Sequence, residues 1–433
     1  MKQYFLTCVC LFGALACYAQ QSLPVSELRQ NPLYAASNTL AYPGPKQQRL
    51  TPAPRGKKPF YLSHYGRHGS RYLTKAQDYD YLLGVLDRAE REQKLSGLGL
   101  DLLRRVRLLQ AEAHGRIGDL TPLGFQQSKD IARRMIERFP EVFKGAATVD
   151  ARSTMVARCI LSMSAALQQM VALNPKLQVV QDASMHDLGY MNFHDRKLIA
   201  NGSKVLAREC YKDYCEKRRF PDRVVQSLFC DSGYVRKLIN SERINYYLFR
   251  LAGDVQNTPL GQQLSLYDFF TPEEIFANWQ KENALWYLSY AHAPQSGGLQ
   301  PFSQRHLLRR IISQADSCIR LAHPGAHLRY GHETIVLPLA CLMGIDGYDA
   351  RIEDLDSLEQ RGWVNYRIYP MGCNIQMVFY RKNPHDSDVL VKVLLNENEA
   401  TLPIESSMAP YYRWADVRDY YLRKLDSYPD DDE

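Results

Sequence analysis

Phe60-Tyr-Leu-Ser-His-Tyr-Gly-Arg-His-Gly-Ser-Arg71 is the stretch that decides the fold, because an apolar run leads directly into one histidine between two arginines. The aromatic and aliphatic residues at 60–65 predict a short buried strand, so the polar residues come at its carboxyl end. Arginine is a planar fork of donors that binds phosphate oxygens bidentately. Histidine loses its proton near neutral pH, and the free ring nitrogen can then attack phosphorus. The stretch therefore predicts a phosphate-handling histidine, and a basic loop with an incidental histidine is the alternative.

Polar side chains also follow two later predicted strands. Residues 146–151 form a strand that ends at Arg152, and residues 327–330 form another that leads into His332 and Glu333. In open α/β sheets, ligands bind beyond the carboxyl ends of the strands, so these side chains can converge with His68 on one crevice. Helices that start after Arg152 and His332 would add a favourable field for an anion.

The rest of the chain reads as alternating helix and strand with one long helical stretch. Further strands are predicted at 177–180, 374–380 and 389–395, the last two as an antiparallel edge pair, and Thr121-Pro122 predicts the start of a helix. We therefore expect an α/β fold with a mostly parallel central sheet flanked by helices and an inserted helical cap domain. The expected division is a core of residues 20–185 and 301–433 and a cap of residues 186–300.

The N-terminus has the order of a secretory signal peptide. Lys2 precedes an apolar stretch at 4–17, and Cys17-Tyr18-Ala19 supplies small residues for cleavage, which predicts a signal peptide of residues 1–19. Lipoprotein anchoring at Cys17 is less favoured, because Ala14 stands where a larger aliphatic residue is usual. No later stretch is apolar for the length of a membrane span, so we expect an exported protein, periplasmic or secreted, without an integral membrane segment after cleavage.

Composition narrows the class of ligand. The formal net charge of +7 fits an anionic substrate, and the lack of a long basic block argues against nucleic acid. Seven cysteines follow the signal segment, which is an odd number, and their spacing does not repeat as the paired C-x-x-C units of a zinc site. A local disulfide is possible among Cys210, Cys215 and Cys230, but the sequence does not choose the pairing.

Four motifs occur in order: Arg67-His-Gly-x-Arg71, Leu120-Thr-x-x-Gly124, Arg152-Ser-Thr154 and His332-Glu333. With these motifs the chain resembles the histidine acid phosphatase branch of the histidine phosphatase superfamily. Residues 328–344 are especially similar to the multiple inositol polyphosphate phosphatases, which act on phytate and related compounds.

The resemblance implies a role for each motif residue. His68 is then the nucleophile that becomes phosphohistidine, and Arg67, Arg71 and Arg152 hold the nonbridging phosphate oxygens. His332 donates to the same phosphate, and Glu333 protonates the leaving oxygen. No metal or cofactor is implied, because arginine and histidine already neutralise the phosphate. The substrate expected is a small anionic phosphoester, and the sequence predicts no particular protein partner.

One departure keeps alternatives open. Glu333 follows His332 directly, whereas in the inositol polyphosphate group the acid usually comes after one intervening alanine. The adjacent arrangement is typical of more general acid phosphatases, so a broad-specificity enzyme for simple phosphomonoesters is the alternative to a phytate hydrolase. A non-catalytic protein that binds a phosphate ligand is the alternative from another class.

Two further groups could touch the substrate. His186-Asp187 and His194-Asp195 could line the mouth of the cap, or they could be ordinary turn polarity. The basic run at 212–223 could bind outer phosphates of a polyanion, although such a run is more often a solvated helix face.

Overall fold

A central eight-stranded sheet carries the strand ends that the sequence singles out. The computed structural model describes residues 24–206, 209–220 and 222–428, so the predicted signal peptide at 1–19, with Cys17, lies outside the described residues. The strand order is β3-β2-β4-β1-β5-β6-β7, and β8 pairs with β6. The strands are β1 (Lys58–Arg67), β2 (Thr148–Ser153), β3 (Gln178–Asp182), β4 (Gly325–Gly331), β5 (Asn374–Arg381), β6 (Leu390–Leu395), β7 (Asn398–Ala400) and β8 (Tyr411–Arg413).

The sheet has a parallel part and an antiparallel part. β3, β2, β4 and β1 run parallel, and their register sets Arg67 beside Gly331 and Ser153 beside Tyr330. The carboxyl ends of β1, β2 and β4 therefore meet at one edge, as the sequence predicts. β5 and β6 are confirmed as an antiparallel pair, and β7 and β8 make the antiparallel part larger than predicted.

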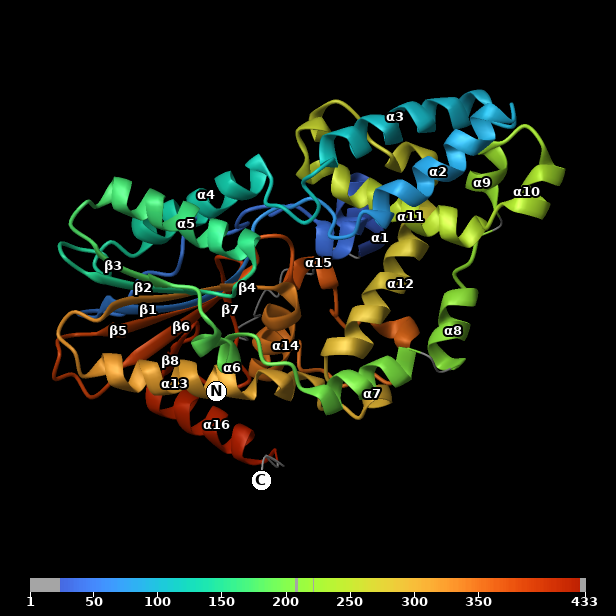
Figure 1. Cartoon of the computed structure of the whole chain (residues 1–433). Coiled ribbons are helices and arrows are strands. Elements are labelled where there is room, and N and C mark those ends of the chain that lie inside the picture. The colour runs from blue at the N-terminus through green and yellow to red at the C-terminus, as the bar shows by residue number, and fades with distance from the viewer. Residues whose placement is uncertain (1–23, 207–208, 221, 429–433) are drawn as a thin grey trace, which may run out of the picture.

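Helices cover both faces of this sheet (Figure 1). α4 (Pro122–Arg138) and α5 (Ala157–Leu173) lie over one face, and α13 (Arg305–Ile319), α14 (Glu333–Met343) and α16 (Trp414–Asp426) lie on the other. Alternation along β1 explains the two cores: Tyr61 and Tyr65 pack toward α13 and α14, while Leu62 packs toward α4 and α5. The predicted α/β class with a central sheet flanked by helices is confirmed.

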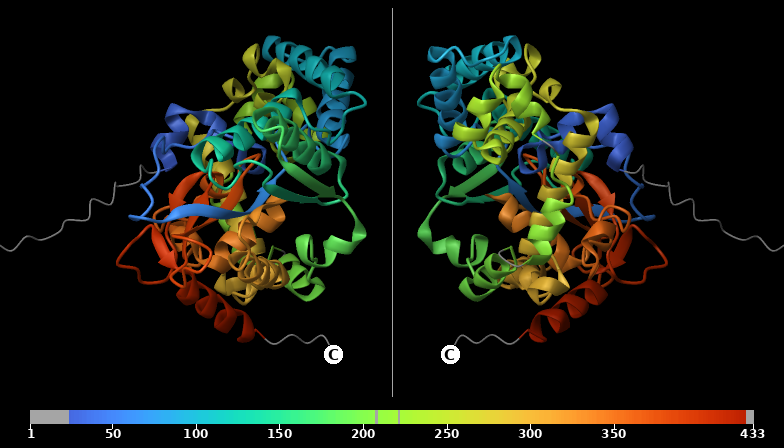
Figure 2. Two further views of the ribbon diagram at one scale, coloured as in Figure 1. Left: turned by 90° about the vertical axis from the view of Figure 1, so that its left-hand side faces the viewer. Right: turned by 90° about the vertical axis from the view of Figure 1, so that its right-hand side faces the viewer.

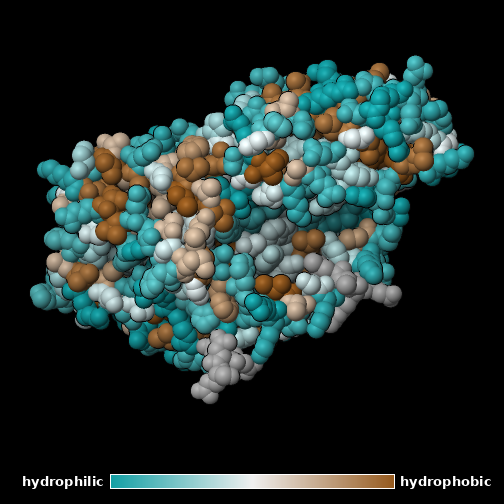
Figure 3. All heavy atoms as spheres, viewed as in Figure 1, coloured by the Kyte–Doolittle hydropathy of each residue, from teal (hydrophilic) through white to brown (hydrophobic). Residues whose placement is uncertain are grey.

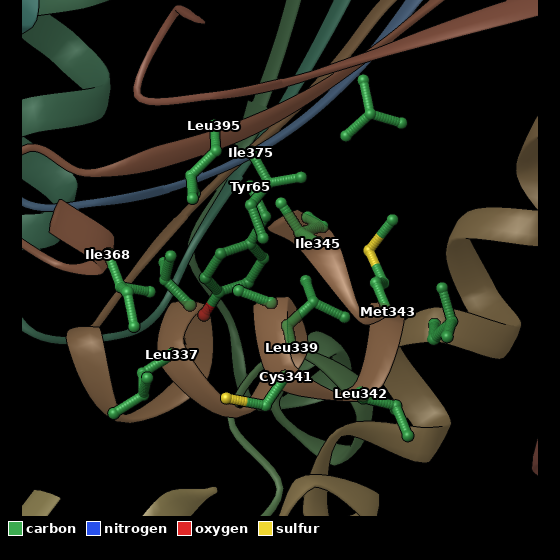
Figure 4. Close-up of a cluster of buried hydrophobic side chains, with 14 of the residues drawn as sticks. Tyr65, Leu337, Leu339, Cys341, Leu342, Met343, Ile345, Ile368, Ile375 and Leu395 are labelled. Carbon is green, nitrogen blue, oxygen red and sulfur yellow. The ribbon is translucent and has the colours of Figure 1, made fainter. Parts of the chain in front are cut away.

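Local sequence signals explain where the helices that carry the site begin. Thr121 caps α4 by accepting from the Gly124 N–H, with Pro122 in the first turn, as predicted. α14 is apolar on all sides and buried over almost its whole length, which is the pattern of a core helix. Figure 4 shows side chains of α14 such as Leu337 and Leu339 packed below Tyr65 and Ile375 of the sheet.

A second, helical layer rises beside the sheet, and in both views of Figure 2 its helices α2, α3 and α11 lie above the sheet. The helices of this layer are α1 (Pro24–Gln30), the 3-10 helix η1 (Pro32–Thr39), α2 (Gln77–Arg91), α3 (Gly97–Ala113), α8 (Glu209–Glu216), α9 (Arg223–Leu228), α10 (Ser232–Leu238), α11 (Ser241–Asp254), α12 (Pro272–Tyr290) and α15 (Asn365–Ile368). Two further helices, α6 (Leu188–Met191) and α7 (Arg196–Leu206), lie lower, on the side of α13. Residues 186–300 are largely helical, as expected. α2 and α3 share a core with α9, α11 and α12, so two helices from the predicted 20–185 segment pack with the insertion.

The described cysteines are all free thiols. The disulfide considered among Cys210, Cys215 and Cys230 is therefore not formed in this structure. Cys210 and Cys215 lie on α8, while Cys230 lies between α9 and α10, where its thiol contacts the Gln93 carbonyl at 3.6 Å. Within the described ranges, no helix is long and apolar enough to cross a membrane.

Candidate active site

His68 lies buried at the carboxyl end of β1, in a loop fixed by backbone hydrogen bonds. Its N–H donates to the Gly331 carbonyl at 3.0 Å, and its carbonyl accepts from the Gly372 N–H at 2.9 Å. The ring Nδ1 lies 2.8 Å from the Gly69 carbonyl, and because a carbonyl only accepts, Nδ1 carries the proton. Nε2 is buried without a partner among the described residues, so its lone pair is free for a ligand.

The second motif supports this loop rather than touching the ligand. A Cβ at Gly69 would come within 2.3 Å of the Gly124 carbonyl oxygen, so the loop and the start of α4 approach as only glycines allow. Thr121 Oγ1 donates to the Ser70 carbonyl at 3.1 Å, and the Ser70 N–H donates to Gln127 at 2.8 Å. The predicted Leu-Thr-x-x-Gly stretch therefore holds the His68 loop rigid.

Three guanidiniums direct positive charge at His68. Burial lowers the pKa of His68 well below its usual value, and the charges of Arg67, Arg71 and Arg158 lower it further. Arg67 Nη2, Arg71 Nε and Arg158 Nε are buried donors without hydrogen-bond partners among the described residues. A tetrahedral dianion placed among them would satisfy these donors and the excess positive charge together.

The structure places Arg158, which no sequence motif marked, beside His68. Arg152, which the motif marked, lies among carboxylates instead. Arg152 Nε lies 2.6 Å from Asp150, and its Nη1 lies 3.3 Å from Asp182 and 3.7 Å from Asp187. Three carboxylates therefore neutralise Arg152, and no described contact ties it to His68. Arg158 stands in the first turn of α5, directly after the same strand.

Arg152 points away from the His68 pocket because side chains alternate between the two faces of β2. Arg152 points to the same face as Asp150, two residues before it, while buried Ala151 and Ser153 face the other way. The contacts therefore place Arg158, and not Arg152, beside His68, while the phosphate-binding role expected of Arg152 stays a prediction. The signal for Arg158 was present, because a helix start after a strand end is also where anions bind.

His332 and Glu333 stand at the start of α14, as predicted. The rings of His68 and His332 meet edge to face with centroids 5.9 Å apart, and His332 Nε2 lies 3.2 Å from Thr154 Oγ1. Burial lowers the pKa of His332 to about 4, against the raising effect of Glu333 and with the help of Arg158. His332 is therefore neutral near pH 7 and lies beside the nucleophile candidate.

The Glu333 carboxylate is held by two groups. Oε2 lies 3.0 Å from Arg67 Nε, and Oε1 accepts from Asn38 Nδ2 at 3.1 Å. Burial alone would raise the pKa of Glu333, but the charges of Arg67 and Arg71 lower it to about 2. Glu333 is therefore ionised in the free protein. Asn38 comes from the irregular lead-in, where no sequence pattern marked it.

A cavity of about 380 Å³ lies between η1, α8, α11 and α12, and Glu333 is not among the residues that line it. Asn38 lines it and links it to the carboxylate. The surface is hollowed where the helical layer meets the sheet part (Figure 3). The basic run at 212–223 does reach this wall, but Arg218 pairs with Asp356 at 2.5 Å and Arg219 pairs with Glu242 at 3.2 Å.

The histidine–aspartate pairs mainly have structural partners. Asp187 faces Arg152, and Asp195 pairs with Arg305 at 2.9 Å. His194 Nε2 lies 3.2 Å from Asn192 Nδ2, and a positive charge on His194 would lower the pKa of His332. Within the part of the chain that the structure describes, no group of three or more His, Cys, Asp or Glu side chains could hold a metal ion.

The chain is similar to named proteins over most of its length. No protein-family model matches the chain. The chain is 23% identical over 383 residues to multiple inositol polyphosphate phosphatase 1 of Gallus gallus, covering 84% of this chain and 81% of that protein.

Solved structures of the same name share the fold. The apo form of the Bifidobacterium longum multiple inositol polyphosphate phosphatase superposes with a TM-score of 0.73 at 15% identity, over 90% of this chain and 97% of that one. A phytase from D. castellii gives a TM-score of 0.66 at 14% identity, over 95% and 90% of the two chains. The predicted resemblance to the histidine acid phosphatase branch is confirmed.

Proposed function

We propose that this chain, which resembles the multiple inositol polyphosphate phosphatases, is a phosphomonoesterase that hydrolyses inositol polyphosphates such as phytate through a phosphohistidine on His68. The observation that carries the proposal is the free Nε2 of a neutral, buried histidine that faces three guanidiniums with unused donors. Fixed positive charge of this kind is what phosphoryl transfer requires at the equatorial oxygens.

The first chemical step forms the phosphohistidine. The Nε2 lone pair of His68 attacks phosphorus, the bond from phosphorus to the ester oxygen breaks, and that oxygen takes a proton from Glu333. Arg67, Arg71 and Arg158 bind the nonbridging oxygens, and His332 lies next to the same group. Because Nδ1 donates to the Gly69 carbonyl, the ring keeps the orientation and tautomer that leave Nε2 reactive.

The second step returns the enzyme to its starting state. Glu333, now ionised, takes a proton from water, the water oxygen attacks phosphorus, and the bond from phosphorus to Nε2 breaks with its electrons returning to the ring. Inorganic phosphate leaves with His68 neutral, and Glu333 then releases its proton to solvent, because its pKa falls again once the anion no longer offsets Arg67 and Arg71. Each proton and electron pair is accounted for without a metal or a cofactor.

The ionised state of Glu333 in the free protein fits an acid role once the substrate is bound. The charges of Arg67 and Arg71 hold its pKa at about 2, and a bound phosphate dianion offsets those same charges. Binding therefore raises the pKa of Glu333, and the carboxylate takes up a proton together with the substrate. Activity should fall as pH rises through the pKa of Glu333 in the complex.

The substrate class has two candidates. The name shared by the relatives supports inositol polyphosphates. The cavity that Asn38 lines favours smaller phosphomonoesters, because its wall carries five carboxylates against four basic side chains and several of the latter are already paired. A substrate with many phosphates would have to compete with those carboxylates.

Phosphate release from phytate and from p-nitrophenyl phosphate separates these candidates. The proposal expects faster release from phytate by the purified protein and none from His68→Ala. Faster turnover of the aryl phosphate with little discrimination would support the broad acid phosphatase instead. If the wild type binds phosphate but releases none from either substrate, the chain is a non-catalytic binding protein.

Export completes the proposal. We propose that residues 1–19 are a signal peptide, as the order of charge, apolar run and small residues indicates. The mass and N-terminal sequence of the protein purified from its natural cells would test this. A mature N-terminus at Gln20 supports export, and an intact Met1 contradicts it.

A further inference from the structure

We propose that Asn38 is a positioning residue that holds the Glu333 carboxyl group toward the leaving group of the substrate. The inference rests on the proposed function, in which Glu333 is the proton donor. Asn38 Nδ2 donates to Glu333 Oε1 at 3.1 Å across 295 residues of sequence. The same side chain lines the cavity beside the site. Asn38 therefore stands between the carboxyl group and the space that a leaving group would fill.

The two oxygens of Glu333 have different partners. Oε2 lies 3.0 Å from Arg67 Nε, on the side of the phosphate pocket, while Oε1 faces Asn38 on the side of the cavity. When phosphate binds Arg67, the ion pair to Oε2 weakens because the guanidinium is shared with the new anion. Asn38 then remains as the neutral contact that fixes the carboxyl group, and fixing a proton donor matters because proton transfer requires hydrogen-bond geometry.

Asn38 is presented by a strained and deeply anchored turn. Ser37, the residue before it, has φ 53° and ψ −121°, a backbone conformation that side-chain-bearing residues rarely adopt. Ser37 is buried, and its Oγ accepts from Asn365 Nδ2 at 3.0 Å. Strain of this kind persists where surrounding contacts fix it, and it gathers at functional sites.

Further buried contacts keep this turn in place. Asn365 Oδ1 accepts from Trp279 Nε1 at 2.8 Å, and the Asn365 N–H donates to Asn283 at 2.9 Å. η1 also packs directly on α11, where a Cβ at Gly253 would come within 2.8 Å of Thr39 Oγ1 and 3.2 Å of Ala36. The position of the Asn38 amide is thus set by the packing of its buried neighbours Ser37 and Thr39 against α11, α12 and α15.

The hydrogen bond from Asn38 predicts the direction in which the pKa of Glu333 changes when Asn38 is replaced. An N–H that donates to a carboxylate favours the ionised form, so losing it raises the pKa of Glu333 in the complex. The descending limb of the pH–rate profile should then move to higher pH. Misplacement of the acid should slow substrates whose leaving group needs a proton, and it should spare an aryl phosphate whose leaving group departs unaided.

The experiment measures kcat/KM, which reports the steps through the first phosphoryl transfer, for glycerol phosphate and for p-nitrophenyl phosphate. It also follows kcat from acidic to neutral pH, because the pH profile of kcat reports the pKa values of the enzyme–substrate complex. Asn38→Ala should lose about tenfold or more on glycerol phosphate and less than about threefold on the aryl substrate, with the descending limb moved to higher pH. Asn38→Asp, nearly the same shape but without the donor, should move the limb further, because a second carboxylate lies beside Glu333.

Asn31→Ala is the matched control, since this asparagine caps the same helix η1 through the Leu33 N–H and is not in contact with Glu333. It should lower thermal stability without changing the ratio of kcat/KM for the two substrates or the descending limb of the pH profile.

The inference is overturned if Asn38→Ala and Asn38→Asp behave like the wild type. It is also overturned if they lose equally on both substrates with an unmoved limb. Glu333→Gln separates a failure of the Asn38 inference from a failure of the assignment of Glu333 as the proton donor. If it shows selective loss and the Asn38 variants do not, only the inference is wrong. If it shows none either, the acid assignment itself fails and the inference fails with it.

Discussion

Arg152, near the end of β2, and Arg158, at the start of the helix that follows it, are six residues apart, yet they lie in opposite electrostatic surroundings. Arg152 is enclosed by Asp150, Asp182 and Asp187, with its closest oxygen 2.6 Å away. Arg158 faces His68 in a pocket where three guanidiniums meet the carboxylate of Glu333, and Asp254 acts on Arg71 from the far side. The difference teaches that an arginine is available to a ligand only where its charge is left uncompensated.

The same contrast explains why the pocket around His68 can bind an anion and why His68 is neutral there. Arg152 itself has three carboxylate neighbours, so little is gained by admitting an anion beside it. In the pocket, buried donors lack partners and the pKa of His68 is lowered well below its usual value by burial and then by the three guanidiniums. The pocket is therefore preorganised for an anion, and its histidine is ready as a neutral nucleophile.

Removing the nucleophile is the harshest test of the pocket. His68→Ala should abolish turnover of every phosphomonoester, by at least about 10⁴-fold, because the covalent route is lost while the guanidiniums still bind the anion. Steady-state phosphate release measures the rate, and sulfate binding by calorimetry should show that the pocket survives. Turnover equal to that of the wild type would remove His68 from the mechanism.

Replacing each arginine separately by alanine tests whether Arg158, rather than Arg152, binds the phosphate. Arg158→Ala should lower kcat/KM by about 10²–10³-fold, the usual cost of removing one fixed donor from a developing charge. Arg152→Ala should leave kcat/KM within about threefold. The reverse ranking would place Arg152 in the phosphate site, as its motif first suggested, and would contradict the contacts described above.

The pH dependence of anion binding is a smaller effect with a definite sign. A bound dianion raises the pKa of Glu333 from about 2, so the complex takes up a proton and binding tightens as pH falls toward the raised value. Sulfate is a suitable probe because it stays a dianion over this range. Titrations should show tightening at acidic pH in the wild type, and Glu333→Gln should lack the part due to this residue. Identical pH dependence in both proteins would exclude proton uptake at Glu333.

The smallest expected effect is a loss of folding stability when Arg152 is removed from its carboxylate neighbours. Arg152→Ala leaves three neighbouring carboxylates without their common partner, which should cost about 1 kcal/mol at neutral pH, as for a partly exposed network. The cost should shrink as the pH falls and these carboxylates take up protons. Thermal unfolding at neutral and acidic pH measures it, and a cost that grows in acid would argue against repulsion among the carboxylates.

The sequence carries much of the fold because local signals decide it. The apolar run before Arg67, the Thr121-Pro122 helix start and the branched residues at 374–380 each specify an element through short-range chemistry, and those elements are present. The order of the strands places Arg67, His68, His332 and Glu333 together for the same reason.

The rest of the site depends on contacts between distant residues. Arg152 loses its predicted place because Asp182 and Asp187 reach it from β3 and from the turn that follows. Asn38 gains a place because Asn365, more than three hundred residues away, holds the turn that carries it. Neither partnership leaves a pattern in the sequence, since each joins segments that meet only in the folded chain.

The most direct measurement is the chemical identity of the covalent intermediate. Glu333→Gln is mixed with p-nitrophenyl phosphate, whose leaving group needs no acid, and quenched in alkali, in which phosphohistidine survives. Because the second step lacks its base, the intermediate should accumulate, and mass spectrometry should find one phosphoryl group on the peptide that contains His68. A phosphoryl group on another residue, or turnover without any covalent intermediate, would contradict the central claim that His68 is the nucleophile.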